Sequence, residues 1–335
     1  MALLPVRHPQ RDFFVLDISD VVPKDDTASM AHPLFSLATK PDMRHLHYQS
    51  GDNSLEIVPS GLGLPTIKDK DVLIFAVSQL MHKKNRGEKI GKRVRFSARE
   101  LSIATNRPIG GNHYKRLEQA FKRLQGTQFT TNIRTGNKRE TRIFSLVDEA
   151  SFVRTDDERF QLDYCEVVLS DWLMRAIEAD EVLTISNDYF RLRRPLERRL
   201  YELARKHCGN QDKWQIGLAN LQNKTGSNAP LKLFRFNLRK IIEDDHTPFY
   251  RMKLTPDDLV IFRARKDREI ASSNIVIPIE AEEEAKQIAI AKGWDYHVMR
   301  SNWLEWAADQ TAKGKPVRNV HKAFVAWCKR QKPLR

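Results

Sequence analysis

The stretch Ser97–Arg142 constrains the fold of this 335-residue chain more than any other segment. A helix is predicted to begin at Ser97, because a Ser N-cap followed three residues later by Glu100 is the capping-box pattern. Pro108 and the glycine pair after it break that helix. Apolar residues at helical spacing then predict a second helix over residues 112–125. The stretch therefore reads as a helix–turn–helix.

A basic hairpin is predicted to follow the second helix. Residues alternate between apolar and polar over 127–134 and 139–146, around a turn that contains Gly136. Such a unit can place a basic helix in the major groove of DNA while the hairpin reaches the backbone. The same pattern also fits a solvated basic helix in any helical protein. The stretch alone leaves both interpretations open.

The same order of elements recurs in the second half of the chain. An amphipathic helix over 195–207 is followed by a strand at 214–216, a short helix near Leu221, a helix over 231–243 and a hairpin over 249–254 and 259–264. Residues 121–124 (Phe-Lys-Arg-Leu) correspond to residues 238–241 (Leu-Arg-Lys-Ile), and residues 127–129 correspond to 247–249. This repeat of basic and apolar positions predicts two winged helices on one chain.

Positive charge is concentrated in these two segments. The chain carries 57 Lys and Arg against 43 Asp and Glu, a net charge of +14. Residues 83–142 hold 17 basic and 4 acidic residues, and residues 191–253 hold 15 and 6. Two separate basic segments indicate an anionic partner at two places. Double-stranded DNA is favoured over a membrane surface, because the charges accompany compact helix–turn–hairpin patterns rather than one long amphipathic helix.

The expected fold class is α+β, with two tandem winged-helix domains followed by a small C-terminal helical unit. We predict an N-terminal arm over 1–42, a first winged-helix domain over 43–158, a second over 159–266, a linker over 267–279 and a C-terminal helical domain over 280–335. Trp303, Trp306, Phe324 and Trp327 in the last domain are interpreted as packing residues, with a partner or single-strand site as the alternative.

The sequence argues against several other classes of protein. Cys165, Cys208 and Cys328 lie far apart, which excludes a CxxC metal site and predicts buried thiols in a reducing cytoplasm. The apolar runs are too short to span a bilayer, and the N-terminus does not read as a secretion signal. There is no P-loop glycine pattern. We expect a cytoplasmic protein with no cofactor, no metal, no catalytic residue and no membrane contact.

A His–Leu–His triplet at residues 45–47 raises one enzymatic alternative. On a strand, both imidazoles would lie on the same face, as in the metal site of rolling-circle nucleases. The sequence suggests no third carboxylate ligand nearby, and Tyr48 is adjacent rather than on a separate helix. A metal-dependent nicking enzyme is therefore the least favoured alternative.

Several stretches carry a resemblance to a known family. They are residues 29–37, 66–74, 94–96, 104–107, 186–193 (Ser-Asn-Asp-Tyr-Phe-Arg-Leu-Arg) and 195–207, which begins Pro-Leu-Glu-Arg-Arg-Leu-Tyr-Glu-Leu. Across about residues 11–266 the chain resembles plasmid replication initiators of the replication initiator protein A type. Residues 199–203 also resemble the wider iteron-binding initiators built from tandem winged helices. Residues 319–327 are similar to C-terminal segments of some phage and primosomal replication proteins.

The resemblance implies a function. Such a protein would bind direct repeats at a plasmid origin, open a nearby A·T-rich segment and recruit the host initiator and replicative helicase. Self-association as a dimer is a further expectation. A winged-helix transcriptional repressor, which could regulate its own gene, is the alternative.

The candidate DNA-binding residues follow from the two copies. In the first copy they are Asn106, Arg107, Asn112, Lys115, Arg116, Gln119, Lys122, Arg123, Arg134, Lys138, Arg139 and Arg142. In the second copy they are Lys224, Lys232, Arg235, Arg239, Lys240, Arg251 and Lys253. Hairpin residues are expected to contact phosphates. The first copy has the denser charge, which suits backbone or partner contact, so the second is expected to supply more of the base readout.

Overall fold

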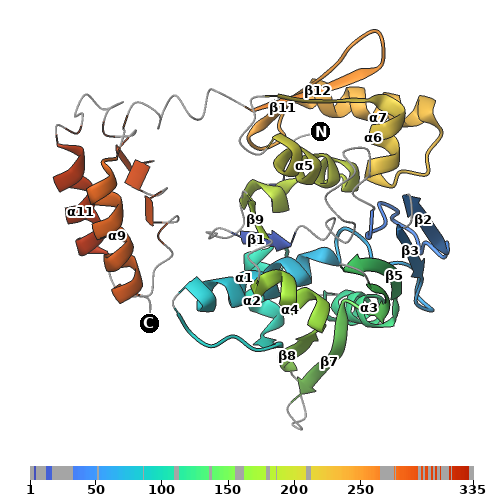
Figure 1. Ribbon diagram of the computed structural model, residues 1–335, viewed down its shortest axis with the longest axis horizontal. Coiled ribbons are helices and arrows are strands. Elements are labelled where there is room, and N and C mark those ends of the chain that lie inside the picture. The colour runs from blue at the N-terminus through green and yellow to red at the C-terminus, as the bar shows by residue number, and fades with distance from the viewer. Residues whose placement is uncertain are drawn as a thin grey trace. The chain divides into compact units, whose positions relative to one another are not determined.

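Figure 1 shows the computed structural model of the chain. The structure describes residues 4, 13–16, 33–50, 53–85, 87–108, 113–135, 138–154, 162–178, 182–185, 187–208, 213–264, 275, 277–292, 296, 299–300, 303–304, 306–307, 310, 317 and 319–331. Contacts between residues divide the chain into two compact units. One comprises residues 1–80 with 91–263, and the other comprises residues 81–90 with 264–335.

The predicted helix–turn–helix is confirmed. Its two helices are α2 (Ala98–Ala104) and α3 (His113–Gly126), which follow α1 (Lys70–Asn85) and β4 (Arg93–Phe96); the turn residues 109–112 lie outside the described part of the structure. The capping box at the start of α2 is complete, since Ser97 accepts from the Glu100 amide and the Glu100 side chain accepts from the Ser97 amide. The helices pack through buried residues that include Leu73, Leu117 and Phe121.

Two antiparallel sheets complete the first half of the unit. One has the strand order β2 (Leu46–Ser50), β3 (Asn53–Val58), β5 (Gln128–Thr135), β6 (Lys138–Phe144). The other has the order β4, β8 (Leu162–Leu169), β7 (Val147–Arg154).

The second half follows the predicted order closely. Its elements are α5 (Pro195–Cys208), β10 (Lys213–Gly217), α6 (Leu218–Thr225), α7 (Leu231–Asp244), β11 (Tyr250–Leu254) and β12 (Leu259–Ala264). The sheet order is β10-β12-β11, so the hairpin after α7 pairs with the strand that precedes the helix–turn–helix. This is the arrangement of a winged helix. Gly226 ends α6 in the left-handed region, with a φ of 74°, which a glycine adopts without strain.

The first half differs from the second in its hairpin. The strands β5 and β6 directly after α3 pair with β3, where buried Phe129 lies opposite Ile57. It is β8 that pairs with β4, with Val94 opposite Val167. The counterpart of β11–β12 is therefore β7–β8, and the predicted match of residues 127–129 with 247–249 is wrong. The sequence repeat could not show this, because the partner of β4 lies some seventy residues away along the chain.

The pairing also bears on the domain boundaries. The predicted boundary between residues 158 and 159 falls between β7 and β8, which are adjacent strands of one sheet. A boundary there would divide that sheet, so we place the end of the first winged-helix domain after β8. The other predicted boundaries remain predictions.

The N-terminal arm contributes a strand. The strand β1 (Phe13–Leu16) pairs antiparallel with β9 (Val182–Ile185), which follows α4 (Asp171–Glu178). Leu4 and Arg191 also exchange hydrogen bonds, of 3.0 Å from the Leu4 amide and 2.8 Å from the Arg191 Nε. Arg191 ends the short 3-10 helix η2 (Asn187–Arg191). These contacts tie part of the arm to the segment between the two winged helices.

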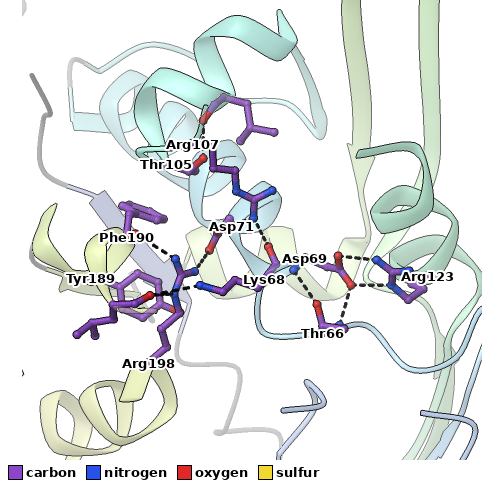
Figure 2. A network of polar contacts seen from close by, with 12 residues as sticks. Thr66, Lys68, Asp69, Asp71, Thr105, Arg107, Arg123, Tyr189, Phe190 and Arg198 are labelled. Atoms are coloured by element: carbon purple, nitrogen blue, oxygen red, sulfur yellow. Dashed lines mark hydrogen bonds and ion pairs between the residues drawn. The ribbon is translucent and has the colours of Figure 1, made fainter. Parts of the chain in front are cut away.

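Two ion pairs join α1 to α5 (Figure 2 shows the Asp71 side of this contact). Asp71 is fully buried and accepts from Arg198 Nη1 at 2.7 Å. One residue earlier, Lys70 Nζ lies 2.9 Å from Glu202 Oε2. Arg198 and Glu202 are one turn apart on α5, so neighbouring charges of α1 meet opposite charges of α5. We call these four residues the α1–α5 clamp.

The clamp carries further partners. Arg107, from the turn after α2, donates to Asp71 Oδ2 at 2.6 Å (Figure 2). Burial acts to raise the pKa of Asp71, but Arg198 and Arg107 outweigh it and the pKa lies below its ordinary value. Tyr189 Oη donates to Glu202 at 2.7 Å. Arg107 and Tyr189 therefore connect the clamp to the first helix–turn–helix and to the segment between the two winged helices.

The C-terminal unit is a small helical core. It contains α9 (Ile279–Lys292) and α11 (Val320–Arg330), which pack around buried Trp303 and Phe324, whose rings lie 5.0 Å apart. The packing interpretation is confirmed for these two aromatics, whereas Trp306 is 39% exposed.

We expect the Asp71→Asn variant to lose about 3–5 kcal/mol of unfolding free energy, because it leaves the buried Arg198 and the half-buried Arg107 guanidinium groups without this charged partner. Urea unfolding monitored by circular dichroism measures the loss. The control is Glu118→Gln, which removes an exposed partner of Lys122 and should cost about 0.5 kcal/mol or less. Equal losses in the two variants would contradict the role of Asp71.

Candidate nucleic-acid interface

Helix α3 presents an exposed basic face. Leu117, Phe121 and Leu124 are buried, while Lys115 and Arg116 are exposed on the opposite side. Among the described residues, no acidic side chain pairs with either of these two cations. Lys122 is also exposed and pairs with Glu118 at 2.7 Å, and Gln119 is half-buried. The free charges of this face are available to an anionic partner.

Three predicted DNA-binding residues of the first copy serve the protein interior instead. Asn106 is only 2% exposed and has a φ of 54° at the end of α2, so its prediction as a DNA contact is wrong. Arg123 donates to both oxygens of Asp69, at 2.7 and 2.8 Å (Figure 2). Arg107 donates to Lys68 O and to Asp71. Planar guanidinium groups suit such paired acceptors, and they hold α3 and the turn against the start of α1.

Helix α7 shows a similar division. Lys232, Arg239 and Lys240 are exposed. Arg235 instead forms an ion pair with Asp258 in the hairpin turn. Lys224, at the end of α6, is 9% exposed, and burial followed by the charges of Lys206 and Arg199 lowers its pKa to about 8. Lys224 is therefore largely buried, which argues against the predicted DNA contact.

The predicted strand residues differ in exposure. Lys253 is exposed on β11, and Arg251 is exposed with Asp245 at 3.3 Å. Arg142 is half-buried on β6. The backbones of Arg134, Lys138 and Arg139 pair between β5 and β6, but their side chains lie outside the described part of the structure, as does the whole of Asn112.

A cavity of about 790 Å³ extends the basic surface of α3 inward. Its lining combines residues of segments 38–41, 66–69, 105–108 and 190–198 with Arg116, Gln119 and Arg123 of α3. Its charged lining residues are Lys40, Lys68, Asp69, Arg107, Arg116, Arg123, Arg193 and Arg198. Burial lowers the pKa of Lys68 to about 7, and Arg198 adds to this effect. Lys40 and Arg193 were not predicted as site residues, because they lie outside both helix–turn–helix segments.

The histidine triplet shows one departure from expectation. His45 Nε2 lies 2.9 Å from Glu56 on β3, which is a nearby carboxylate that the sequence did not suggest. Glu56 is opposite His47 in the strand register. Even so, the described residues contain no group of three or more His, Cys, Asp or Glu side chains arranged to hold a metal ion.

The structure also bears on the predictions of buried thiols and of apolar segments too short to span a membrane. Cys165, Cys208 and Cys328 are free thiols in buried positions, and burial raises the pKa of Cys165 to about 12. Such thiols are poor nucleophiles and poor metal ligands at neutral pH. Among the described helices, we find none with the length and apolar character needed to cross a membrane.

Comparisons with known proteins identify the family. Topology defines the main unit as a tandem winged-helix protein. The model of the replication initiator protein A family matches residues 24–252. A "Putative replication protein" of Wigglesworthia glossinidia brevipalpis is 34% identical over 259 residues, which are 76% of this chain and 94% of that protein. The chain belongs to the replication initiator protein A family, which confirms the resemblance seen in the sequence.

One solved structure shares this fold, and a second has a lower TM-score. Domains 2 and 3 of RctB superpose with a TM-score of 0.50 and 12% identity, covering 69% of this chain and 94% of that chain. The Pi initiator protein, solved in complex with iteron DNA, has a TM-score of 0.44 and 14% identity, covering 61% of this chain and 92% of that chain. The predicted fold class of two winged helices with a C-terminal helical unit is confirmed.

The variants Arg116→Ala and Arg123→Ala test whether two arginines of α3 have different roles, one at the surface and one in the interior. Arg123→Ala should lower the unfolding free energy by about 3 kcal/mol, because it leaves buried Asp69 unpaired. Arg116→Ala should change it by no more than about 0.5 kcal/mol and should weaken DNA binding. Urea unfolding and fluorescence anisotropy on a DNA duplex measure the two effects. Loss of stability in Arg116→Ala alone would contradict this assignment.

Lys68→Met tests the electrostatics of the cavity. The unfolded chain holds the Lys68 proton up to a pH of about 10.4, whereas the folded chain loses it near a pKa of about 7. Between these values the unfolded state binds more protons, so this lysine makes stability rise with pH. The unfolding free energy of Lys68→Met should lack that rise with pH. It should exceed the wild-type value by most at pH 6, where folded wild-type protein carries the buried charge. Urea unfolding from pH 6 to 9.5 gives both curves, and parallel curves would contradict the expected shift.

Proposed function

We propose that this protein is a non-enzymatic plasmid replication initiator that binds direct repeats of double-stranded origin DNA through both winged helices. The observation that carries the proposal is the presence, within one compact unit, of two helix–turn–helix elements whose second helices each expose cations. These cations are Lys115 and Arg116 on α3, and Lys232, Arg239 and Lys240 on α7. Membership of an initiator family supports initiation over general DNA binding.

The two helices would have different tasks. The exposed face of α3 is dominated by Lys115, Arg116 and Lys122, and it continues into a basic cavity, which suits contact with phosphates. Helix α7 exposes both cations and apolar side chains, which suits contact with base edges. Lys253 and Arg251 on the hairpin would contact the flanking backbone.

The α1–α5 clamp supports joint binding by the two helices. Because Asp71 and Lys70 hold α5 against α1, the second helix–turn–helix cannot swing freely from the first. Once one helix binds, the other meets its segment of DNA as an intramolecular event. We propose that the bound chain then promotes opening of an A·T-rich segment and recruits the host initiator and replicative helicase in the bacterial cytoplasm. A dimer of the chain remains a prediction.

The salt dependence of binding tests the size of the footprint. If both winged helices and their hairpins neutralise about eight phosphates, log K should fall against log salt with a slope near −7. Anisotropy titrations from 50 to 300 mM salt, approximately, would measure the slope on a duplex of the flanking DNA. A slope near −2 would mean that only one small patch binds, and would contradict a two-domain footprint.

Arg239→Ala tests base readout by α7. If Arg239 contacts a guanine, its removal should weaken binding to the specific site by about 1–3 kcal/mol and leave binding to random DNA nearly unchanged. Lys253→Ala on the hairpin is the matched control. It should weaken binding to the specific site and binding to random DNA equally. Equal losses on both DNAs for Arg239→Ala would make it a phosphate contact instead.

A further inference from the structure

Helix α7 exposes large apolar side chains that the core does not use. Its buried stripe consists of Phe234, Leu238 and Ile241, each at most 1% exposed. By contrast, Leu233 is 47% exposed and Phe236 is 52% exposed. Exposed apolar area of this kind on a helix that would face DNA calls for a partner with an apolar feature.

Phe236 occupies the centre of the exposed face. Residues of a helix advance by about 100°, so Phe236 lies nearly opposite the buried stripe and one turn from both Lys232 and Lys240. Lys240 Nζ is 4.3 Å from the centroid of the Phe236 ring. Leu233 is three residues before Phe236 and adjoins it on the surface. The apolar patch is therefore enclosed by cations.

The enclosing charge favours one occupant. A second copy of this face would bring Lys232, Arg239 and Lys240 against like charges, which is unfavourable. Duplex DNA offers phosphates to these cations. Its major groove also presents an apolar group, the C5 methyl of thymine, which apolar side chains contact in direct readout. The acidic residues of the helix, Glu243 and Asp244, lie in its last turn, away from Phe236.

We propose that Phe236 and Leu233 are specificity-determining residues that contact thymine methyl groups in the repeat. This inference rests on the proposed function, because it requires α7 to lie in the major groove. Lys232, Arg239 and Lys240 position the helix on the phosphates and purine edges, and the apolar pair selects thymine at one or two positions.

Replacement of single thymines by deoxyuridine tests this directly, because it removes only the methyl group. The probe is the duplex that the full-length chain selects from a random-sequence pool, together with versions in which each thymine in turn is replaced. Wild-type protein should bind about fourfold more weakly at one or two positions, the effect of losing one buried methyl group. Phe236→Ala should show no uracil penalty at one of those positions. Lys232→Ala should weaken binding equally on all duplexes and retain the penalties.

Two results would overturn the inference. One is a wild-type protein that binds the selected duplex specifically but shows no uracil penalty, which leaves the proposed function intact. The other is a Phe236→Ala protein that keeps every penalty, whether or not its oligomeric state changes in sedimentation. Phe236→Leu, which keeps an apolar side chain, should retain part of the penalty and shows that the Ala result is not a folding defect. Absence of any selected duplex would defeat the proposed function, and this inference with it.

Discussion

The ion pairs between α1 and α5 are the contact on which the arrangement of the two winged helices depends. Asp71 and Lys70 are adjacent, buried and opposite in sign, and each meets a partner on α5 that is one turn from the other. Removing two such charges from water is costly, so the pairs hold only where both partners are in place. Arg107 brings the turn of the first helix–turn–helix to the same carboxylate. Charge complementarity thus specifies how one winged helix joins the other.

Ion pairs within the protein, of which the clamp is one set, decide which cations remain exposed. Arg107, Arg123, Arg198 and Arg235 are engaged with carboxylates of the protein. The exposed face of α3 is basic, whereas the exposed face of α7 combines basic and apolar side chains. In the proposed function, α3 therefore suits contact with DNA phosphates, and α7 suits contact with the edges of bases.

The order of helices, the capping box and the winged helix of the second half could be predicted from the sequence, because local periodicity and turn chemistry determine them. The pairing of β4 with β8 could not, because it joins distant strands and an inserted hairpin imitates the expected one. The sequence also could not show that Arg123 is engaged inside the protein while Arg116 is exposed. The ion pair of Arg123 is with Asp69, which is distant in sequence. The sequence predicted an amphipathic helix over 195–207 but could not show that Glu197, Arg198 and Glu202 on it are buried, because their partners Lys70 and Asp71 are distant in sequence.

The measurement that tests the account most directly is a hydroxyl-radical footprint of the full-length chain on the DNA that flanks its own gene. Two winged helices held by one clamp predict several direct repeats, each with two protected patches about ten base pairs apart on one face of the duplex. A single inverted repeat, or one protected patch per repeat, would contradict joint DNA binding by two winged helices that the α1–α5 clamp holds together.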